Sequence, residues 1–181
     1  MFTVGDRDMK KLLLAAFVAS FLTGCANNQG QEAITGVDRH SGSKTVLMQP
    51  HGTDCKSMQC IAIGAFWAES EKDTALLNIS LMNTTDFVRS AYFEIDGKKY
   101  QLRDGGDLTR YERPLANYSA YAQSRKDYLV PLDLIKKLST AKKAWIFVET
   151  GSGVMSDAII DSQGDSKAFY AMQRFLKQIP Y

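Results

Sequence analysis

Apolar and polar side chains alternate with a period of two along several short segments of this chain. That period is typical of strands that bury one face and expose the other. Leu77, Ile79 and Leu81 alternate with more polar residues in this way. The segment 60–67 is apolar almost throughout and predicts a more deeply buried strand. We expect further strands at 45–48, 128–130, 144–148 and 154–160.

A β-hairpin is predicted where two alternating segments flank an Asp-Gly pair. Ala91, Phe93 and Ile95 are the apolar positions of the first segment, and 98–102 is the second. Asp96-Gly97 between them tolerates the positive φ angles of a type I′ turn, whose twist matches that of paired strands.

Two segments have the period of amphipathic helices. Pro131 suits the first turn of a helix, and Leu134, Ile135 and Leu138 share one face after it. A second helix, capped by Asp165 or Ser166, is expected near the C-terminal end. Its apolar face comprises Ala168, Phe169, Met172, Phe175, Leu176 and Ile179.

This order of elements predicts one α+β domain over residues 44–181. We expect a mostly antiparallel β-sheet or a sandwich-like arrangement with two helices, including the C-terminal amphipathic helix. The segment 103–126 is polar and is expected to be irregular.

The N-terminal part has a different pattern. Lys10 and Lys11 precede a short apolar segment, 12–22. Membrane-spanning helices need about 20 apolar residues, whereas signal peptides use about 7–15. The segment is therefore expected to direct export rather than to span a membrane. Met9 gives a cleaner signal peptide than Met1, because two acidic residues lie between them.

The end of this apolar segment carries a more specific motif. Leu22-Thr23-Gly24-Cys25 resembles the lipobox of bacterial lipoproteins, in which small residues precede an acylated cysteine. The resemblance implies that 1–24 is a signal peptide and that Cys25 carries the lipid that binds the membrane. Ala26 replaces the Asp that commonly retains such proteins at the inner membrane. The expected location is therefore the outer membrane, facing the periplasm.

Residues 25–43 are expected to form the lipidated cysteine and a flexible tether. The segment is rich in Asn, Gln, Gly and Ser and has few apolar side chains to offset the entropy of ordering.

Charge restricts the choice of partner. The whole chain has a formal net charge of +2, and the part after residue 24 is close to +1. So small a charge argues against nucleic acid as a partner. The expected partners are the membrane, through Cys25, and an envelope protein or peptidoglycan.

Cys55 and Cys60 form an even pair in an oxidising compartment, which favours a disulfide. The alternative is a redox or metal site, because His51 lies four residues before Cys55. A structural zinc site needs four ligands, and the only other histidine, His40, lies in the expected tether. We expect no metal and no cofactor.

No sequence motif of a known catalytic class is present, and no catalytic residue is assigned. An envelope hydrolase remains an alternative, because paired carboxylates can cleave glycosidic bonds without histidine. The candidate carboxylates of such a site are Asp104, Asp107, Glu112 and Asp127.

A segment rich in Tyr and Arg is the strongest candidate for an interaction surface. Flat amphipathic rings and guanidinium groups are enriched at protein interfaces. The candidate residues are Arg110, Tyr111, Arg113, Tyr118 and Tyr121. The sequence therefore favours a membrane-anchored binding or structural module over an enzyme.

Overall fold

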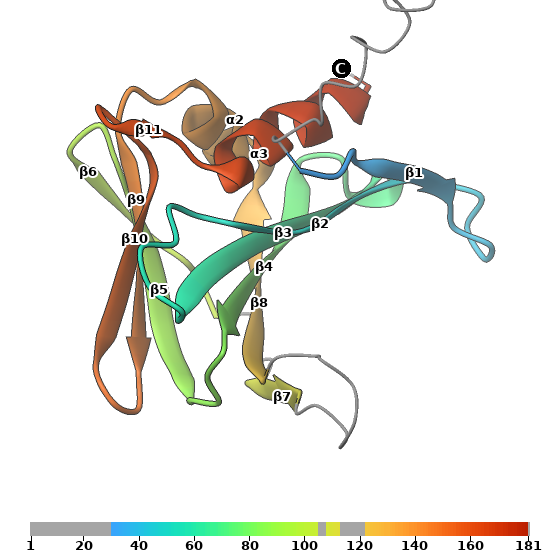
Figure 1. Cartoon of the computed structure of the whole chain (residues 1–181). Helices are drawn as coiled ribbons and strands as arrows, with labels where there is room; N and C mark the ends of the chain where they lie inside the picture. Colours follow the sequence, from blue (N-terminus) through green and yellow to red (C-terminus); the bar gives the residue numbers. More distant parts are fainter. Residues whose placement is uncertain (1–29, 105–107, 113–121, 181) are drawn as a thin grey trace, which may run out of the picture.

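The fold is a sandwich of two antiparallel sheets with two helices at one end (Figure 1). The computed structural model describes residues 30–104, 108–112 and 122–180. The predicted α+β class, with mostly antiparallel strands and two helices, is confirmed. Among the described residues, no helix combines the length and hydropathy needed to span a membrane.

One sheet has six strands in the order β1-β2-β3-β4-β8-β7. The strands are β1 (Ile34–Val37), β2 (Lys44–Gly52), β3 (Cys60–Ala68), β4 (Thr74–Met82), β7 (Arg110–Glu112) and β8 (Gln123–Pro131). A short 3-10 helix, η1 (Glu69–Glu71), lies between β3 and β4.

The other sheet has five strands in the order β11-β10-β9-β5-β6. The strands are β5 (Val88–Ile95), β6 (Lys98–Gln101), β9 (Ala144–Thr150), β10 (Val154–Asp161) and β11 (Gly164–Asp165). β5 and β6 are the predicted hairpin, and Asp96 and Gly97 both have positive φ, at 48° and 81°. The Asp-Gly signal is therefore confirmed.

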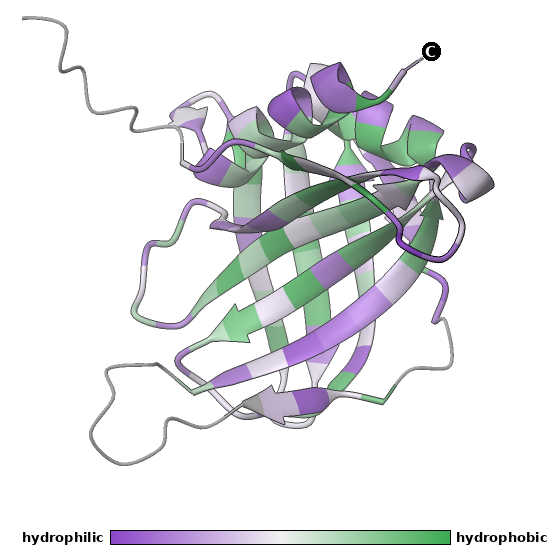
Figure 2. Ribbon diagram, turned by 90° about the vertical axis from the view of Figure 1, so that its right-hand side faces the viewer, coloured by the Kyte–Doolittle hydropathy of each residue, from purple (hydrophilic) through white to green (hydrophobic). Residues whose placement is uncertain are grey.

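The core lies between the sheets and under the helices. Alternate residues of the longer strands point inward, as the period of two requires. The six-stranded sheet contributes Val46, Ile61, Ile63, Leu77, Ile79, Leu81 and Val130, and the five-stranded sheet contributes Ala91, Phe93, Ile146 and Val148. Figure 2 shows how hydrophobic residues follow these strands and the undersides of the helices.

The helices are α2 (Leu132–Thr140) and α3 (Lys167–Gln178). α3 packs against β2 and β3, and α2 packs against α3 and β8. Of the two predicted caps, Ser166 is the N-cap of α3, and its Oγ accepts a hydrogen bond from the Phe169 N–H at 3.2 Å. Pro131 directly precedes α2 as its N-cap residue rather than lying in its first turn.

The two sheets are joined along one side, between β3 and β10. The backbone N–H of Asp54 donates to the carbonyl oxygen of Ala158 at 2.8 Å. The Asp157 carboxylate accepts hydrogen bonds from the Ile61 N–H at 2.9 Å and the Thr53 hydroxyl at 3.0 Å. Burial raises the pKa of this Asp157 carboxyl group. We call this side the joined seam.

The Cys55–Cys60 disulfide closes the loop at the joined seam, as predicted. The loop leads from β2 into β3 and carries the Asp54 contact with β10. The disulfide therefore restrains a segment that connects the two layers.

Two segments contain more regular structure than their composition predicts. β1 lies within 25–43, the segment expected to be a tether, and pairs with β2 from Ile34↔Leu47 to Val37↔Lys44. β8 begins at Gln123, within the segment expected to be irregular, and β7 pairs with it. In both places backbone pairing to an existing strand supplies the stability that buried apolar side chains supply elsewhere.

Replacing both cysteines, Cys55→Ser with Cys60→Ser, is expected to lower the free energy of unfolding by about 2 kcal/mol, because the unfolded loop regains its entropy. Urea denaturation followed by circular dichroism measures this change. Met58→Ala, in the same loop and exposed, is the matched control and should leave the midpoint unchanged. Equal midpoints for all three proteins would contradict a stabilising role for the disulfide.

Candidate functional site

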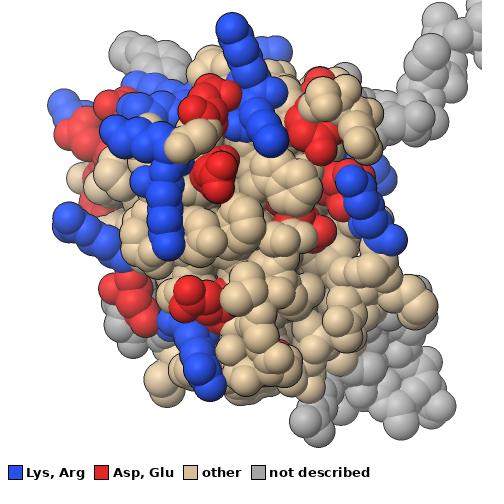
Figure 3. Space-filling view, turned by 90° about the vertical axis from the view of Figure 1, so that its left-hand side faces the viewer, with Lys and Arg blue, Asp and Glu red and all other residues tan. Residues whose placement is uncertain are grey.

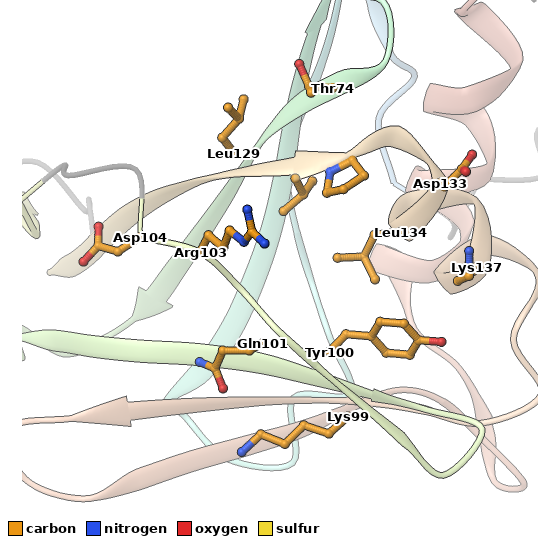
Figure 4. Close-up of a pocket in the computed structure, with 12 residues that line it drawn as sticks. Thr74, Lys99, Tyr100, Gln101, Arg103, Asp104, Leu129, Asp133, Leu134 and Lys137 are labelled. Carbon is orange, nitrogen blue, oxygen red and sulfur yellow. The ribbon is translucent and has the colours of Figure 1, made fainter.

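A groove of about 770 Å³ opens between the two sheets on the side opposite the joined seam (Figure 4). β6 and the residues after it form one wall, the end of β8 forms the other, and the first turns of α2 close the top. The lining residues are Thr74, Lys99, Tyr100, Gln101, Arg103, Asp104, Leu129, Val130, Pro131, Asp133, Leu134 and Lys137. We call it the seam groove. Its volume is in the range of small-molecule sites, about 300–1,000 Å³.

The seam groove exists because the described parts of the two sheets meet at one end of this side, which includes the bridge between Asp104 and Tyr128. There the Lys126 Nζ donates to the Val88 carbonyl oxygen at 3.4 Å, and the Val88 N–H donates to the Thr109 hydroxyl at 3.1 Å. Beyond this contact β6 is the last strand of its sheet, and β7 pairs with β8 only as far as Arg125. The two edges therefore diverge and leave the space that α2 covers.

The charges around the seam groove are unequally neutralised. Asp104 forms an ion pair with Lys126 at 2.7 Å, and Asp133 forms one with Lys136 at 3.3 Å. Within the described part of the chain, the side chains of Arg103 and Lys137 make neither an ion pair nor a hydrogen bond. The groove therefore combines two neutralised acids with two cations for which the described residues supply no counterion.

Lys99 is directed elsewhere. Its Nζ lies 3.7 Å from the centroid of the Tyr92 ring, on the outer face of the five-stranded sheet. In Figure 4 its side chain runs away from the space between Arg103 and Leu134. We therefore assign it to the rim of the seam groove rather than to its interior.

Tyr128 lies on the inner face of β8, fully buried, next to the Asp104–Lys126 pair. Burial, and then the negative charge of Asp104, raise the pKa of the phenol well above its ordinary value. The Lys126 Nζ lies 5.9 Å from the centroid of its ring. The phenol is therefore neutral at physiological pH and is not a base.

The outer face of the six-stranded sheet carries a second feature, an exposed row of apolar side chains. Directly paired residues of neighbouring strands point to the same face. The pairs Ile34↔Leu47, Leu47↔Phe66, Phe66↔Leu76 and Leu76↔Leu129 run through β1, β2, β3, β4 and β8. We call these five residues the apolar row. At a strand spacing of about 4.8 Å it is roughly 19 Å long.

Four members of the apolar row are exposed. The exposed fractions are 54% for Ile34, 39% for Phe66, 36% for Leu76 and 48% for Leu129. Figure 2 views the molecule from this side. Single exposed apolar residues are common on soluble proteins, but a contiguous row is typical of an interaction surface.

A hollow of about 180 Å³ adjoins the apolar row. Gly64 lies beside Met48 and Pro50, two of the residues that line the hollow, where the register of β2 and β3 shifts between Met48 and His51. A Cβ atom at position 64 would lie only 3.0 Å from the Met48 carbonyl oxygen, so the close approach of β2 favours glycine here. Pro50, Asn78 and Asp127 line the hollow together with members of the row.

The polar side of this hollow is a closed network. Asp127 is buried, accepts a hydrogen bond from the Asn78 amide and forms an ion pair with Arg110. Ser80 in turn donates to the Asn78 side-chain oxygen at 2.8 Å. Arg110 belongs to β7, so the network connects this edge strand to β8 and β4 in the interior of the sheet.

The predicted Tyr and Arg residues are only partly described. Arg110 and Tyr111 lie on β7, with exposed side chains. Arg113, Tyr118 and Tyr121 lie outside the described residues. The sequence therefore pointed to one member of the surface next to the hollow, Arg110, but not to the apolar row.

The candidate carboxylates of a hydrolase are not brought together where they are described. Successive residues of a strand point to opposite faces, so Lys126 holds Asp104 on the inner side of β8 while Asp127 points outward. Asp107 and the side chain of Glu112 lie outside the described residues. Asp104 and Asp127 therefore do not form an acid–base pair.

His51 has a structural role. Its Nδ1 lies 2.6 Å from the Gln49 carbonyl oxygen, and its Nε2 accepts the Gln31 N–H at 2.9 Å, so both ring nitrogens are occupied. His40 is exposed in the turn between β1 and β2. In the ranges that the structure covers, no three His, Cys, Asp or Glu side chains are grouped so that they could hold a metal ion.

Comparison with known proteins gives no further guide. No protein-family model matches the chain, and no curated protein or solved structure matches it.

Asp104→Ala is expected to lower the free energy of unfolding by about 1–3 kcal/mol, because it leaves the Lys126 ammonium, only 4% exposed, without its counterion. Asp133→Ala is the matched control in the same groove. It removes only a surface pair three residues apart on α2, worth about 0.5 kcal/mol or less. Chemical denaturation compares the two. Equal losses of unfolding free energy in the two variants would contradict the buried character of the Asp104–Lys126 pair.

Proposed function

We propose that this chain is a bacterial envelope lipoprotein, anchored by lipid on Cys25 and facing the periplasm, whose sandwich domain is a non-catalytic module that docks on an envelope protein. The observation that carries the docking is the apolar row with its adjoining hollow. The lipobox and the preceding apolar segment support the anchor.

The position of the first described residues supports a short connection to the membrane. The Arg174 guanidinium donates to the Gln31 carbonyl oxygen at 3.0 Å, and the Gln31 N–H donates to His51. Only five residue steps separate Cys25 from Gly30, and an extended chain spans about 17 Å in five steps. On this proposal, the corner formed by β2 and α3 is held close to the bilayer.

The length of chain between Cys25 and the apolar row also restricts where the partner can lie. Ile34, the first member of the apolar row, follows Cys25 by nine residues, a distance of at most about 30 Å. A partner that covers the row must therefore itself lie near the membrane. This favours an envelope protein that is membrane-bound or associated with the membrane surface.

The chemistry of the surface favours a protein over peptidoglycan. Sugars are recognised by stacking on aromatic rings, and Phe66 is the single aromatic member of the apolar row. Four aliphatic side chains are suited to burial against apolar side chains of a partner. The hollow beside Gly64 can receive one such side chain, as the central pockets of protein interfaces do.

Replacing the lipidated thiol tests the anchor. In cells fed with a clickable palmitate analogue, the wild type is expected to be labelled and to sediment with membranes. Cys25→Ser should lose both the label and the processing to a shorter form, because the thiol is the site of acyl attachment. An unlabelled, full-length wild type in the cytosol would refute the anchor.

Photo-crosslinking tests the docking surface. A photoreactive amino acid at Phe66 or Ile34 is expected to trap the same discrete partner in intact cells. The same group at Glu94, exposed on the five-stranded sheet, is the control and should not trap it.

A second substitution shows whether the trapped contact depends on the apolar row. Leu76→Lys places a charge in the middle of the row and should abolish the crosslink from Phe66, with the denaturation midpoint unchanged. Crosslinks of equal yield from Glu94, or a yield at Phe66 that Leu76→Lys leaves unaltered, would refute docking through this surface.

A further inference from the structure

We infer that the seam groove is a separate binding site for an anionic amphiphile, a molecule with one carboxylate head and a single apolar chain. The Arg103 guanidinium binds the head, and the walls of the groove bind the chain. The inference does not depend on the docking surface: Leu129 lies at the border of both, but Arg103, Tyr100 and Leu134 belong to the seam groove alone.

The walls of the groove supply a partly exposed apolar surface. Its accessible members are half-buried Tyr100 of β6 and exposed Leu129 and Pro131 of β8, whereas Val130 and Leu134 line the groove but are only 2% and 8% exposed. Leu134 of α2 lies above Tyr100 in Figure 4. Pro131 closes the β8 side and, having no N–H, offers no donor there. An aliphatic chain placed between these groups would leave water without giving up hydrogen bonds.

Arg103 is placed to hold the head group. It follows β6 directly, and in Figure 4 its guanidinium points into the space between β8 and β6 rather than away from the molecule. The two nearby acids do not neutralise it, since Asp104 is paired with Lys126 and Asp133 with Lys136. A guanidinium group binds a carboxylate through two parallel hydrogen bonds, which a single ammonium cannot reproduce.

The surroundings favour an anion over a neutral ligand. The turn between β5 and β6 meets the turn before β9, where the Asp96 carboxylate accepts the N–H groups of Lys142 and Lys143 at 3.1 and 2.9 Å. This contact gathers four exposed lysines at one corner beside the groove: Lys98, Lys99, Lys142 and Lys143. Figure 3, which views the five-stranded sheet, shows Lys and Arg toward the end that carries the helices, interspersed with Asp and Glu. The four lysines at this corner raise the local concentration of anions.

Lys137 is the second cation of the groove and has a smaller role. It lies on α2, on the other side of Leu134 from Arg103 in the view of Figure 4. An anion held by Arg103 is therefore attracted by Lys137 across the groove but does not contact it. Substitutions of the two cations should consequently weaken binding unequally.

Calorimetric titration of the full chain in phosphatidylcholine vesicles tests the inference, with protein-free vesicles as the blank. Octanoate is expected to bind at one saturable site. Octanol, which has the same chain without the charge, and acetate, which has the charge without the chain, should bind far more weakly.

The variants separate the role of the head group from a general effect of charge. Arg103→Gln should weaken octanoate binding about tenfold or more, the usual value of a charged hydrogen-bonded pair, and Arg103→Lys should recover part of it. Lys137→Gln should lower the affinity for octanoate less than Arg103→Gln does. Arg89→Gln and Lys167→Gln, exposed and outside the groove, are the matched controls and should have none.

Three results would overturn the inference. They are the absence of saturable octanoate binding, octanol bound as tightly as octanoate, and an Arg103→Gln variant with wild-type affinity and stability. None of these bears on the crosslinks from Phe66, so the two proposals can fail independently.

Discussion

The pairing of β4 with β8 is the constraint on which the described surfaces depend. The register Leu76↔Leu129 and Asn78↔Asp127 sets which side chains of β8 point inward and which point outward. It places Lys126 between the sheets, where it meets Asp104 and Val88, and leaves Leu129 as the last member of the apolar row. A shift of one residue would exchange the two faces, bury Asp127 between the sheets and expose Val130.

The two sides of the sandwich differ in how the described parts of the two sheets are joined. At the joined seam, backbone hydrogen bonds and the Asp157 carboxylate connect β3 to β10, and the disulfide restrains the loop that makes the contact. On the opposite side the described residues connect the layers around Lys126, through its contacts with Asp104 and Val88 and the bridge between Asp104 and Tyr128, and α2 covers the gap beyond. The seam groove thus follows from the architecture, while its chemistry follows from Arg103 and the residues around it.

Sequence patterns predict those parts of the fold that depend on buried apolar side chains or on turn chemistry. The hairpin at Asp96-Gly97 and the Ser166 cap were predictable because each depends on a few adjacent residues. The strand β1 was not predictable, because all its side chains are exposed and only its backbone pairs with β2. The first half of β8 also lacks an apolar pattern, since ion pairs with residues distant in sequence satisfy Lys126 and Asp127. The apolar row and the seam groove depend on register between strands, which a single sequence does not contain.

The register of β4 and β8 can be measured directly by forming a disulfide between them. Paired residues of antiparallel strands have Cα atoms about 4.5–5.5 Å apart, which suits a disulfide. Leu76→Cys combined with Leu129→Cys should therefore oxidise to a new disulfide, mapped by mass spectrometry beside the intact Cys55–Cys60 bond. Leu76→Cys with Val130→Cys should not, because position 130 points to the opposite face. A disulfide formed with position 130 in preference to 129 would contradict the register, and with it the apolar row and the placement of Lys126 and Asp127.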